Sequence, residues 1–333
     1  MLTNKHDSMA VLGIESSAHT FGAGVVEGGK ILANAKEMYH IEGTGMLPMK
    51  AADLHAANAA KVIRRALRQA RMSMRDITAI GYTKGPGIGP CLRVGMLAAK
   101  TLAQVHSLPL YPVNHAVAHI EITRHLSGMG DPIVLYVSGG NSQVLGRVEE
   151  PFRHYNVYGE TFDIGVGNML DNFARAAKLN PAWGSSVAKL AEGGRYLRMP
   201  YTVKGMDFTF TGLLTNAVKM LASNDWKDVA FSLQETAFAM LSEATERAML
   251  LARKSGVIVC GGVAQSSRLS SMLEAMAAQH GERFFVAPNE YNADNGAMIA
   301  FVAEQMAKSG RAVPYAECTV NQKFRADTVR LLW

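Results

Sequence analysis

Short apolar segments alternate with amphipathic stretches along the chain. The first three apolar segments, separated by small polar turns, are VLGIE from Val11, FGAGVVE and KILANA. Apolar runs of this length between Ser/Thr or Gly-Gly turns are typical of strands, so the pattern predicts a three-strand meander. Apolar positions spaced by three to four residues then predict helices over about 49–72, over about 91–106 and from Asn114, with strands over ITAIGYT and LPLYPV between them.

The same order recurs about 122 residues further along the chain. A second meander is predicted by IVLYVS from Ile133, SQVLGRVE and RHYNVY. It is followed by predicted helices near 166–178 and 228–254, the strand GVIVCGG, a helix from Ser266, the strand RFFVA and a helix from Asn295. Both halves have the order βββαβαβα, and the second contains an insertion at about 180–225. We therefore expect an α/β protein of two duplicated lobes: residues 1–130, on which 309–333 packs back, and residues 131–308.

Composition narrows the class of protein. Of the 333 residues, 48% are hydrophobic and 19% are charged, which excludes a disordered chain. No apolar run approaches the ~18 residues of a membrane span, and the N-terminus has no apolar segment of a secretory signal, so we expect a cytoplasmic protein that does not bind membranes. The cysteines, Cys91, Cys260 and Cys318, are too far apart for a disulfide framework or a cysteine-rich zinc site. Any metal must therefore be held by His, Asp, Glu or Tyr.

Basic residues gather in one predicted helix. Lys and Arg outnumber Asp and Glu by 34 to 28, which gives a net charge of +6. Basic residues recur every three to four positions, with no acid among them, at Lys61, Arg64, Arg65, Arg68, Arg71 and Arg75. The pattern fits a solvated helix face, a surface for a phosphate backbone, or a surface for an acidic partner.

Two histidines form a candidate metal site. His115 and His119 are four residues apart, so a helix places both on one face, a turn apart, where they can chelate one ion. Ala116 follows His115, so the HExxH motif of zincin proteases is absent. Asp294 lies where a helix is expected to begin and could instead cap it, and Tyr136 ends an apolar strand and could instead pack in the core. Spacing alone does not join these four residues.

A small-residue turn follows the first strand of each half. It contains Ser16-Ser17 in the first half and Ser138-Gly139-Gly140 in the second. Two similar α/β lobes are expected to meet at a cleft that both turns face. Backbone N–H groups of such turns bind phosphate oxygens, which small residues allow to approach. We therefore expect a nucleotide to bind there.

Six segments resemble one protein family: IESSAHTFGAG at Ile14, KGPGIGPCLRVG at Lys84, VNHAVAHIE at Val113, LYVSGGNSQV at Leu135, GETFDIGVGNMLD at Gly159 and ADNGAMIA at Ala293. They occur in the family's order over nearly the whole chain. The family they resemble is the catalytic subunit of the archaeal and eukaryotic KEOPS complex, whose bacterial relatives are the TsaD proteins, formerly described as O-sialoglycoprotein endopeptidases.

The resemblance implies an actin-like, sugar-kinase-like (ASKHA) fold with ribonuclease H-like repeats. It implies transfer of threonylcarbamoyl from threonylcarbamoyl-adenylate to the N6 amine of the adenosine beside the anticodon, in tRNAs that read A-starting codons. In the family, one iron or zinc ion is held by residues that match His115, His119, Tyr136 and Asp294. The bound nucleotide, which is ATP, AMP or threonylcarbamoyl-adenylate, is held by residues that match Tyr136, Val137, Ser138, Gly139, Gly140, Asp171 and Gly184.

Two positions depart from the family pattern. Ala188 replaces an acid that would contact the nucleotide, and Ser266, at the nucleotide site, replaces an asparagine. These changes bring the strength of nucleotide binding into question. The motifs do not identify the base that removes the amine proton; His19, beside the first turn, and Glu15 are the candidates.

The resemblance also implies partners: tRNA and the other KEOPS subunits, among them a small kinase-like ATPase and a small dimerising subunit. Two other functions fit parts of the sequence. An ATPase or small-molecule kinase of the same fold could use Glu15 as a base or magnesium anchor, but it has no evident use for the histidine pair. A non-catalytic scaffold would explain Ala188 and Ser266, but not the retained metal ligands.

Overall fold

The computed structural model describes residues 9–39, 47–310 and 312–333. Its contacts divide the chain into two compact units. The first unit consists of Met1–Ile122, Pro151–His154 and Ala293–Trp333, and the second consists of Thr123–Glu150 and Tyr155–Asn292. Among the described residues, no helix is both long and apolar enough to cross a membrane.

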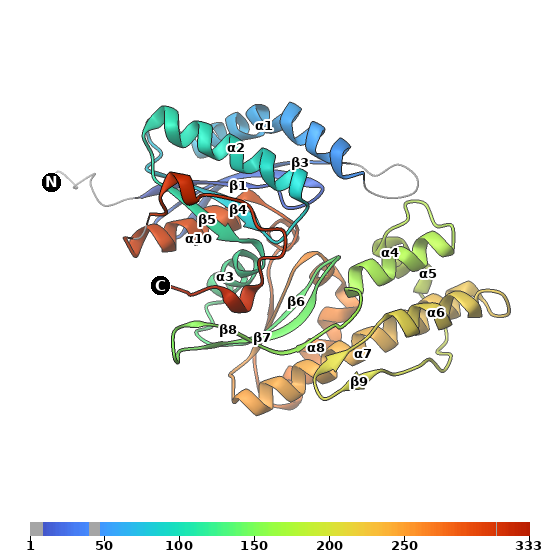
Figure 1. Cartoon of the computed structure of the whole chain (residues 1–333). Helices are drawn as coiled ribbons and strands as arrows, with labels where there is room; N and C mark the ends of the chain where they lie inside the picture. The colour runs from blue at the N-terminus through green and yellow to red at the C-terminus, as the bar shows by residue number, and fades with distance from the viewer. Residues whose placement is uncertain (1–8, 40–46, 311) are drawn as a thin grey trace. The chain divides into compact units, whose positions relative to one another are not determined.

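The described strands of the first unit form a sheet in the order β3-β2-β1-β4-β5. Their bounds are β1 (Ala10–Glu15), β2 (Thr20–Glu27), β3 (Lys30–Met38), β4 (Ala79–Gly85) and β5 (Leu110–Asn114). β1 pairs antiparallel with β2 and parallel with β4, which is itself parallel to β5. The carboxyl ends of β1, β4 and β5 therefore lie at one edge of the sheet. Figure 1 shows α1 (Pro48–Ala70) and α2 (Gly89–His106) over one face and α10 (Gly296–Lys308) on the other.

Helix α10 packs closely on the first sheet because glycines face it. A Cβ atom at Gly13 in β1 would lie 2.1 Å from the backbone nitrogen of Ala300. A Cβ atom at Gly22 in β2, which pairs with Glu15, would lie 2.8 Å from the backbone nitrogen of Gly296. These glycines bring the first residues of α10 to the carboxyl end of β1.

The division into units differs from the expected lobes in the placement of α10. The predicted second lobe extends to residue 308. In the structure, the chain from Ala293 onward belongs to the first unit, because α10 packs on β1, β2 and β4. The other boundary lies at Ile122, inside helix α3 (His115–Ser127), and not near residue 130.

The second unit repeats the sheet of the first. Its described strands have the order β12-β11-β6-β7-β8. Their bounds are β6 (Ile133–Val137), β7 (Ser142–Val148), β8 (His154–Glu160), β11 (Val257–Cys260) and β12 (Phe284–Val286). β6 is antiparallel to β7 and parallel to β11, which is parallel to β12. Each strand thus has the place of its counterpart in the first sheet, and the duplicated α/β fold predicted from the sequence is confirmed.

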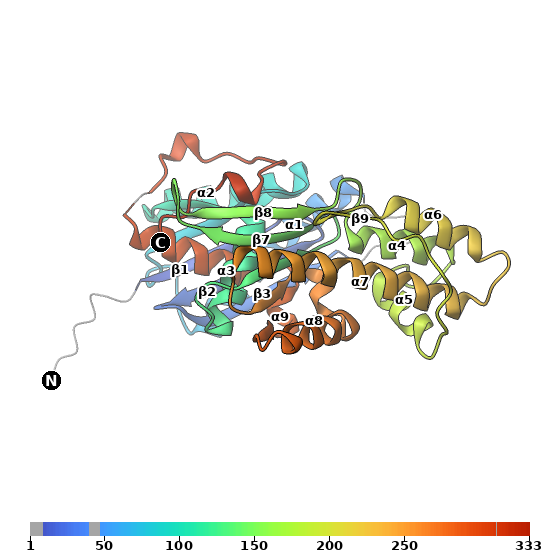
Figure 2. The ribbon, with the colours of Figure 1, turned by 90° about the horizontal axis from the view of Figure 1, so that it is seen from below.

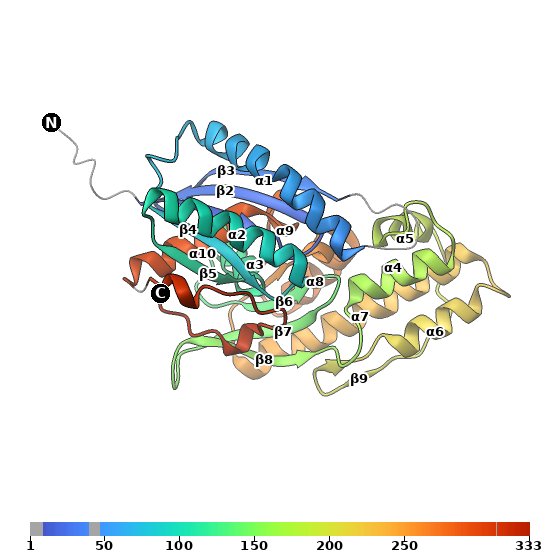
Figure 3. The same cartoon turned by 45° about the horizontal axis from the view of Figure 1, so that its top comes forward.

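The hydrophobic core of the second unit is formed by its sheet together with most of its helices. Figures 2 and 3 show where the helices of this unit lie. They are α4 (Val166–Ala176), α5 (Gly184–Ala191), α6 (Thr211–Met220), α7 (Trp226–Ala252), α8 (Ser267–Gln279) and the short α9 (Asn289–Asn292). The insertion at 180–225 provides α5, α6 and the hairpin of β9 (Val203–Lys204) and β10 (Asp207–Phe208). Asp163 anchors it, since its carboxylate accepts hydrogen bonds from the backbone nitrogens of Phe210 at 3.0 Å and Thr211 at 2.8 Å, where α6 begins.

Candidate metal centre and nucleotide-binding turn

His115 and His119 lie in the first turns of α3, directly after β5. Asn114, the last residue of β5, fixes the start of the helix, because its Oδ1 accepts a hydrogen bond from the backbone nitrogen of Val117 at 3.0 Å. Both histidines are buried, with ring centroids 4.7 Å apart and ring planes at 86°. The two imidazoles therefore lie together on one face of α3.

Asp294 reaches the same place from the start of α10. The next residue, Asn295, caps that helix by accepting a hydrogen bond from the backbone nitrogen of Met298 at 3.0 Å. The capping role that the sequence left open for Asp294 thus belongs to its neighbour. Asp294 Oδ1 lies 3.3 Å from His119 Nε2 and 3.5 Å from His115 Nε2.

These three side chains lie close enough together to hold one metal ion. One ligand atom from each lies within 4.8 Å of the other two. In a tetrahedral site with bonds of about 2.0–2.1 Å, neighbouring ligand atoms are roughly 3.3 Å apart. The separations of 3.3 and 3.5 Å between Asp294 Oδ1 and the two Nε2 atoms match that spacing. Since two imidazoles and a carboxylate suit zinc or iron, the residues fit the divalent ion that the family resemblance implies.

Glu15 lies behind His115, where it can orient the ring. Its Oε2 is 3.0 Å from His115 Nδ1 and accepts a hydrogen bond from Thr83 Oγ1 at 2.7 Å, while its Oε1 accepts one from the backbone nitrogen of Ser17 at 2.5 Å. The Glu15 side chain is fully buried. A carboxylate at Nδ1 keeps the proton on that nitrogen and leaves the Nε2 lone pair for an ion.

In the metal-free protein, the positive charge of His115 and the negative charges of Glu15 and Asp294 stabilise one another. Burial opposes protonation of His115, but the charge and hydrogen bond of Glu15 raise its pKa to about 9. Burial lowers the pKa of His119. Burial opposes ionisation of Asp294, but the hydrogen bond with His119 and the charge of His115 hold the Asp294 pKa well below its usual range. His115 likewise outweighs the effect of burial on Glu15 and lowers its pKa. Two carboxylates and one imidazolium leave an excess of negative charge, which attracts a cation.

The two candidate bases differ in access. His19 is half-buried in the turn between β1 and β2, four residues after Glu15. Glu15 is fully buried behind His115 and accepts three hydrogen bonds. This arrangement favours His19 over Glu15 as a group that can reach a substrate.

The turn after β6 has the features of a phosphate site. The backbone nitrogen of Ser138 donates to Asn141 O at 2.8 Å, and that of Asn141 donates to Ser138 Oγ at 3.0 Å. Gly139 and Gly140 are exposed, and within the described part of the chain their backbone N–H groups have no acceptor. The start of α4 packs against the turn, since a Cβ atom at Gly167 would lie 2.8 Å from Ser138 O. Exposed amides beside a helix N-terminus suit an anion.

The structure brings two of the predicted nucleotide residues together. The backbone nitrogen of Gly184, the first residue of α5, donates to Asp171 Oδ1 at 2.8 Å. Ala188 follows one turn later in α5. Ser266 caps α8, because its Oγ accepts a hydrogen bond from the backbone nitrogen of Leu269 at 3.4 Å. Asparagine caps helices equally well, so this departure from the family pattern leaves the helix start intact.

Tyr136 and Val137 are buried in β6 of the second unit. A Cβ atom at Gly261 would lie 3.3 Å from Tyr136 Cε2, so the tyrosine ring packs beside this glycine. His115, His119 and Asp294 belong to the first unit, whereas Tyr136 belongs to the second. The role of Tyr136 as a fourth metal ligand therefore stays a prediction.

The basic segment is only partly helical. Helix α1 ends at Ala70, so Arg71 and Arg75, which were expected to lie on the same helix, follow it. Lys61 and Arg65 lie 3.8 and 3.6 Å from the Glu37 carboxylate in β3. The remaining basic side chains are exposed and form no ion pair among the described residues: Arg64, Arg68, Arg71 and Arg75.

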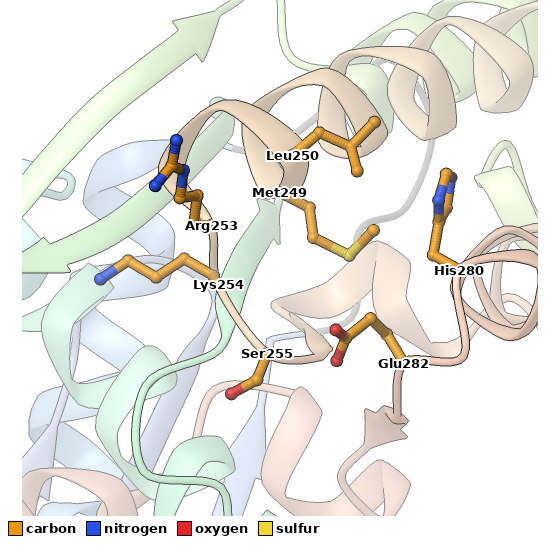
Figure 4. A pocket seen from close by; sticks show the side chains of 7 residues that line it. All are labelled: Met249, Leu250, Arg253, Lys254, Ser255, His280 and Glu282. Carbon is orange, nitrogen blue, oxygen red and sulfur yellow. The ribbon is translucent and has the colours of Figure 1, made fainter.

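A surface depression of about 340 Å³ lies at the end of α7 in the second unit. It is lined by Met249, Leu250, Arg253, Lys254, Ser255, His280 and Glu282 (Figure 4). Lys254 Nζ is 2.5 Å from Asp131 Oδ2, and His280 Nε2 is 2.6 Å from Glu246 Oε1. The depression lies at the amino ends of β11 and β12, whereas ligands of such sheets bind at the carboxyl ends. It is therefore separate from the nucleotide-binding turn.

Comparison with known proteins identifies the family. The sequence model of the family TsaD: tRNA N6-adenosine threonylcarbamoyltransferase matches residues 29–301. A protein of that name from Thermococcus sibiricus is 44% identical over 328 residues, which are 98% of this chain and 100% of the relative. A probable bifunctional tRNA threonylcarbamoyladenosine biosynthesis protein from Thermoplasma acidophilum is 44% identical over 327 residues, which are 98% of this chain and 61% of that protein.

Among solved structures, HypF from T. kodakarensis has a TM-score of 0.61 with 16% identity, and the match covers 90% of this chain and 48% of that one. This likeness shows the fold alone. The fold and the site define a duplicated α/β protein with a His/His/Asp cluster whose two histidines are buried. The chain belongs to the TsaD family of tRNA N6-adenosine threonylcarbamoyltransferases, as its motifs predicted.

Proposed function

We propose that the chain transfers the threonylcarbamoyl group of threonylcarbamoyl-adenylate to the N6 amine of the adenosine beside the anticodon, in tRNAs that read A-starting codons. The observation that carries this proposal is family membership over nearly the whole chain. In the reaction, N6 forms a bond to the carbamoyl carbon, and the bond from that carbon to the phosphate oxygen breaks. AMP leaves with the electron pair, and the amine proton passes to a base.

His115, His119 and Asp294 would hold one iron or zinc ion, with Tyr136 as a fourth ligand. When bound, the ion supplies Lewis acidity toward the carbamoyl carbonyl or an anchor for the threonyl portion. Glu15 would keep His115 in the tautomer that presents Nε2. The support for His115, His119 and Asp294 is the separation of their nitrogen and oxygen atoms and the orienting contact of Glu15.

The AMP portion would bind to the second unit. The amides of Gly139 and Gly140 would donate to the phosphate, and the N-terminus of α4 would add its dipole. The ribose would lie near Asp171 and Gly184, which already share a hydrogen bond. Val137, Ser138 and Ser266 would complete the nucleotide site.

The adenosine amine is a weak nucleophile because its lone pair is delocalised into the purine ring. Positioning and proton removal must therefore supply much of the rate. His19 is the proposed base, since it lies in the turn that follows β1, whose last residue Glu15 contacts His115, and is not fully buried.

The proposed partners are tRNA and the KEOPS subunits, among them a small kinase-like ATPase and a small dimerising subunit, and the proposed location is the cytoplasm. A net charge of +6 is small for a protein that binds RNA alone. Affinity for a nucleic acid grows with the number of phosphates that are neutralised, so we expect weak, salt-sensitive tRNA binding until partners extend the surface.

The alternative functions lose support at specific residues. An ATPase or kinase would use Glu15 as a base or magnesium anchor, but that carboxylate is buried against His115, Ser17 and Thr83. A non-catalytic scaffold would have no use for the His/His/Asp cluster.

Reconstitution tests the proposal. The chain is incubated with threonylcarbamoyl-adenylate and an unmodified tRNA that reads A-starting codons, with and without the KEOPS subunits, and N6-threonylcarbamoyladenosine is measured by mass spectrometry. We expect product with the partners and its loss in His119→Ala. Phosphate transfer or ATP hydrolysis by the chain, without modified adenosine, would support the kinase alternative. Intact metal and tRNA binding without either product would support the scaffold.

A further inference from the structure

Residues 319–333, named here the C-terminal strap, run along the elements that carry the metal cluster (Figure 1, the dark red segment that ends at C). At its start, Thr319 O accepts a hydrogen bond from Tyr82 Oη at 2.9 Å. The backbone nitrogen of Asn321 donates to Lys84 O at 2.7 Å. The strap thus begins against β4.

The chain after β4 is shaped to receive the strap. A Cβ atom at Gly85 would lie 1.8 Å from Asn321 O, so only glycine allows this approach. The backbone nitrogen of Gly87 donates to Gln322 O at 3.3 Å, and that of Gly89 donates to Gln322 Oε1 at 3.2 Å. Backbone and side chain of the strap therefore both bind the connection between β4 and α2.

Asn114 joins the strap to the helix that carries the histidines. While its Oδ1 caps α3, its Nδ2 donates to Phe324 O at 2.9 Å and to Arg325 O at 3.4 Å. The residue is 3% exposed. Because His115 follows Asn114 directly, one buried side chain connects the strap to the first turn of α3.

A second contact lies just beyond His119. Trp333 Nε1 donates to Glu121 Oε2 at 3.2 Å. Between the two contacts the strap is held down, since Ala326 and Leu331 are buried and the backbone nitrogen of Leu331 donates to Arg153 O at 2.8 Å. The strap therefore contacts α3 on both sides of the His115–His119 turn.

We propose that the C-terminal strap positions the metal-binding turn of α3, and that Asn114 is the positioning residue through which it acts. The proposal rests on the proposed metal role of His115 and His119. The two histidine Nε2 atoms can bind one ion only if they lie a suitable distance apart. Asn114 preserves that distance because it fixes the start of α3 through both its cap hydrogen bond and its hydrogen bonds to the strap. Changes in groups that orient metal ligands typically weaken metal affinity by about 10- to 100-fold.

The test separates the strap contact from the cap. Asn114→Ser keeps an oxygen that can accept from Val117 but removes the donor to the strap. The matched control is Asp225→Ser at the start of α7, where Asp225 Oδ1 accepts a hydrogen bond from the backbone nitrogen of Lys227 at 2.9 Å. Hydrogen exchange of residues 115–121 is measured in metal-free protein. Co²⁺ affinity and the Co²⁺ absorption spectrum are measured on the same variants.

We expect faster exchange in residues 115–121, a Co²⁺ affinity about tenfold weaker and an altered Co²⁺ spectrum in Asn114→Ser, with none of these in Asp225→Ser. Wild-type exchange and Co²⁺ affinity in Asn114→Ser would overturn the proposal. If that variant does not fold, Asn114→Asp keeps the oxygen that caps α3 and removes the donor to Phe324 O and Arg325 O, and wild-type exchange of residues 115–121 in it would overturn the proposal equally. Wild-type protein that binds no Co²⁺ would refute the metal assignment, while the exchange measurement would still decide whether the strap holds α3.

Discussion

The two units differ in the chemistry of one equivalent point, the turn after the first strand. β1 and β6 occupy the same place in their sheets. β1 ends at Glu15, a buried carboxylate that contacts a histidine. β6 instead leads into Ser138-Gly139-Gly140, which carries no charged side chain and whose two exposed glycines present backbone amides.

The difference shows that the duplicated fold supplies a position, whereas the residues in it determine the chemistry. In the first unit, two carboxylates gather around two histidines, and the excess negative charge favours a cation. In the second unit, glycine amides beside the start of α4 favour an anion. One repeat is thus suited to a metal ion and the other to a phosphate.

The largest expected effect concerns the first unit. Replacing His115 by Ala removes one of three converging ligands. Metal affinity should therefore fall by more than the ~100-fold that is lost when a group that only orients a ligand is changed. Metal content by mass spectrometry, with anomalous scattering for position, measures the result. His280→Ala, in the second unit, is the matched control and should retain full metal. Equal metal content in His115→Ala would refute the assignment.

Metal affinity should also depend on pH. The His115 pKa is raised from 6.5 to about 9 in the metal-free protein, so an incoming ion must displace a proton at neutral pH. Apparent affinity should rise about tenfold per pH unit between roughly 6.5 and 9 and then level off. The same proton stabilises the metal-free fold fully below pH 6.5, and this contribution is lost as the pH rises through about 9. Competition titrations at three pH values measure the slope, and a flat profile would contradict the prediction.

In the second unit, Gly140→Val should weaken AMP binding by about tenfold, the loss expected for one charge-assisted hydrogen bond. A Cβ atom at Gly140 meets nothing within 4 Å, so the fold should tolerate the change while the side chain blocks the phosphate. At Gly139 it would lie 3.2 Å from Asn168 Oδ1, so Gly139→Val would also disturb the turn. Calorimetry with AMP measures the effect. Gly130→Val, at another open and exposed glycine, is the control, and unchanged AMP affinity in Gly140→Val would exclude this phosphate site.

The features that could be predicted from the sequence are those that depend on the local pattern of apolar and polar residues. Strand and helix order followed from apolar spacing, and the shared face of His115 and His119 followed from the helical period. The contacts that complete the cluster join distant residues: Glu15 is 100 positions from His115, and Asp294 is 175 from His119. No periodicity carries such information, and the motif resemblance alone linked Asp294 to the histidines.

Two further features could not be decided from the sequence. Asp294 and Asn295 are adjacent and both can cap a helix, so local preference could not separate ligand from cap. The helical pattern of α10 was evident, but not which sheet it covers. Gly13 and Gly22 in the strands were the available signal, because glycine inside a strand often marks close approach of another backbone.

A smaller effect is expected at the end of α1. Charge reversal at Arg64, Arg68 and Arg71 should weaken tRNA binding several-fold across tRNA sequences and reduce the salt slope, because each arginine can neutralise about one phosphate. Titration of labelled tRNA at two salt concentrations, with and without partner subunits, measures this. If this surface docks a subunit instead, the same change should abolish complex formation and leave tRNA binding by the lone chain untouched. Tight, salt-insensitive binding by the lone chain would contradict both roles.

The smallest effect is expected where the second unit departs from its family. Restoring the expected acid with Ala188→Glu and the expected amide with Ser266→Asn should leave AMP affinity equal or raise it a few-fold. Asparagine can replace Ser266 as the cap of α8, so that helix should stay in place. At 188, the new carboxylate would lie one turn into α5, near the helix start that Asp171 already holds through Gly184.

Calorimetry on the single and double variants, with unfolding temperature as a control for the fold, measures the outcome. A large fall in affinity with an unchanged unfolding temperature would show that nucleotide contacts known from the family do not transfer to this unit. The metal cluster of the first unit, intact in these variants, should bind its ion as before.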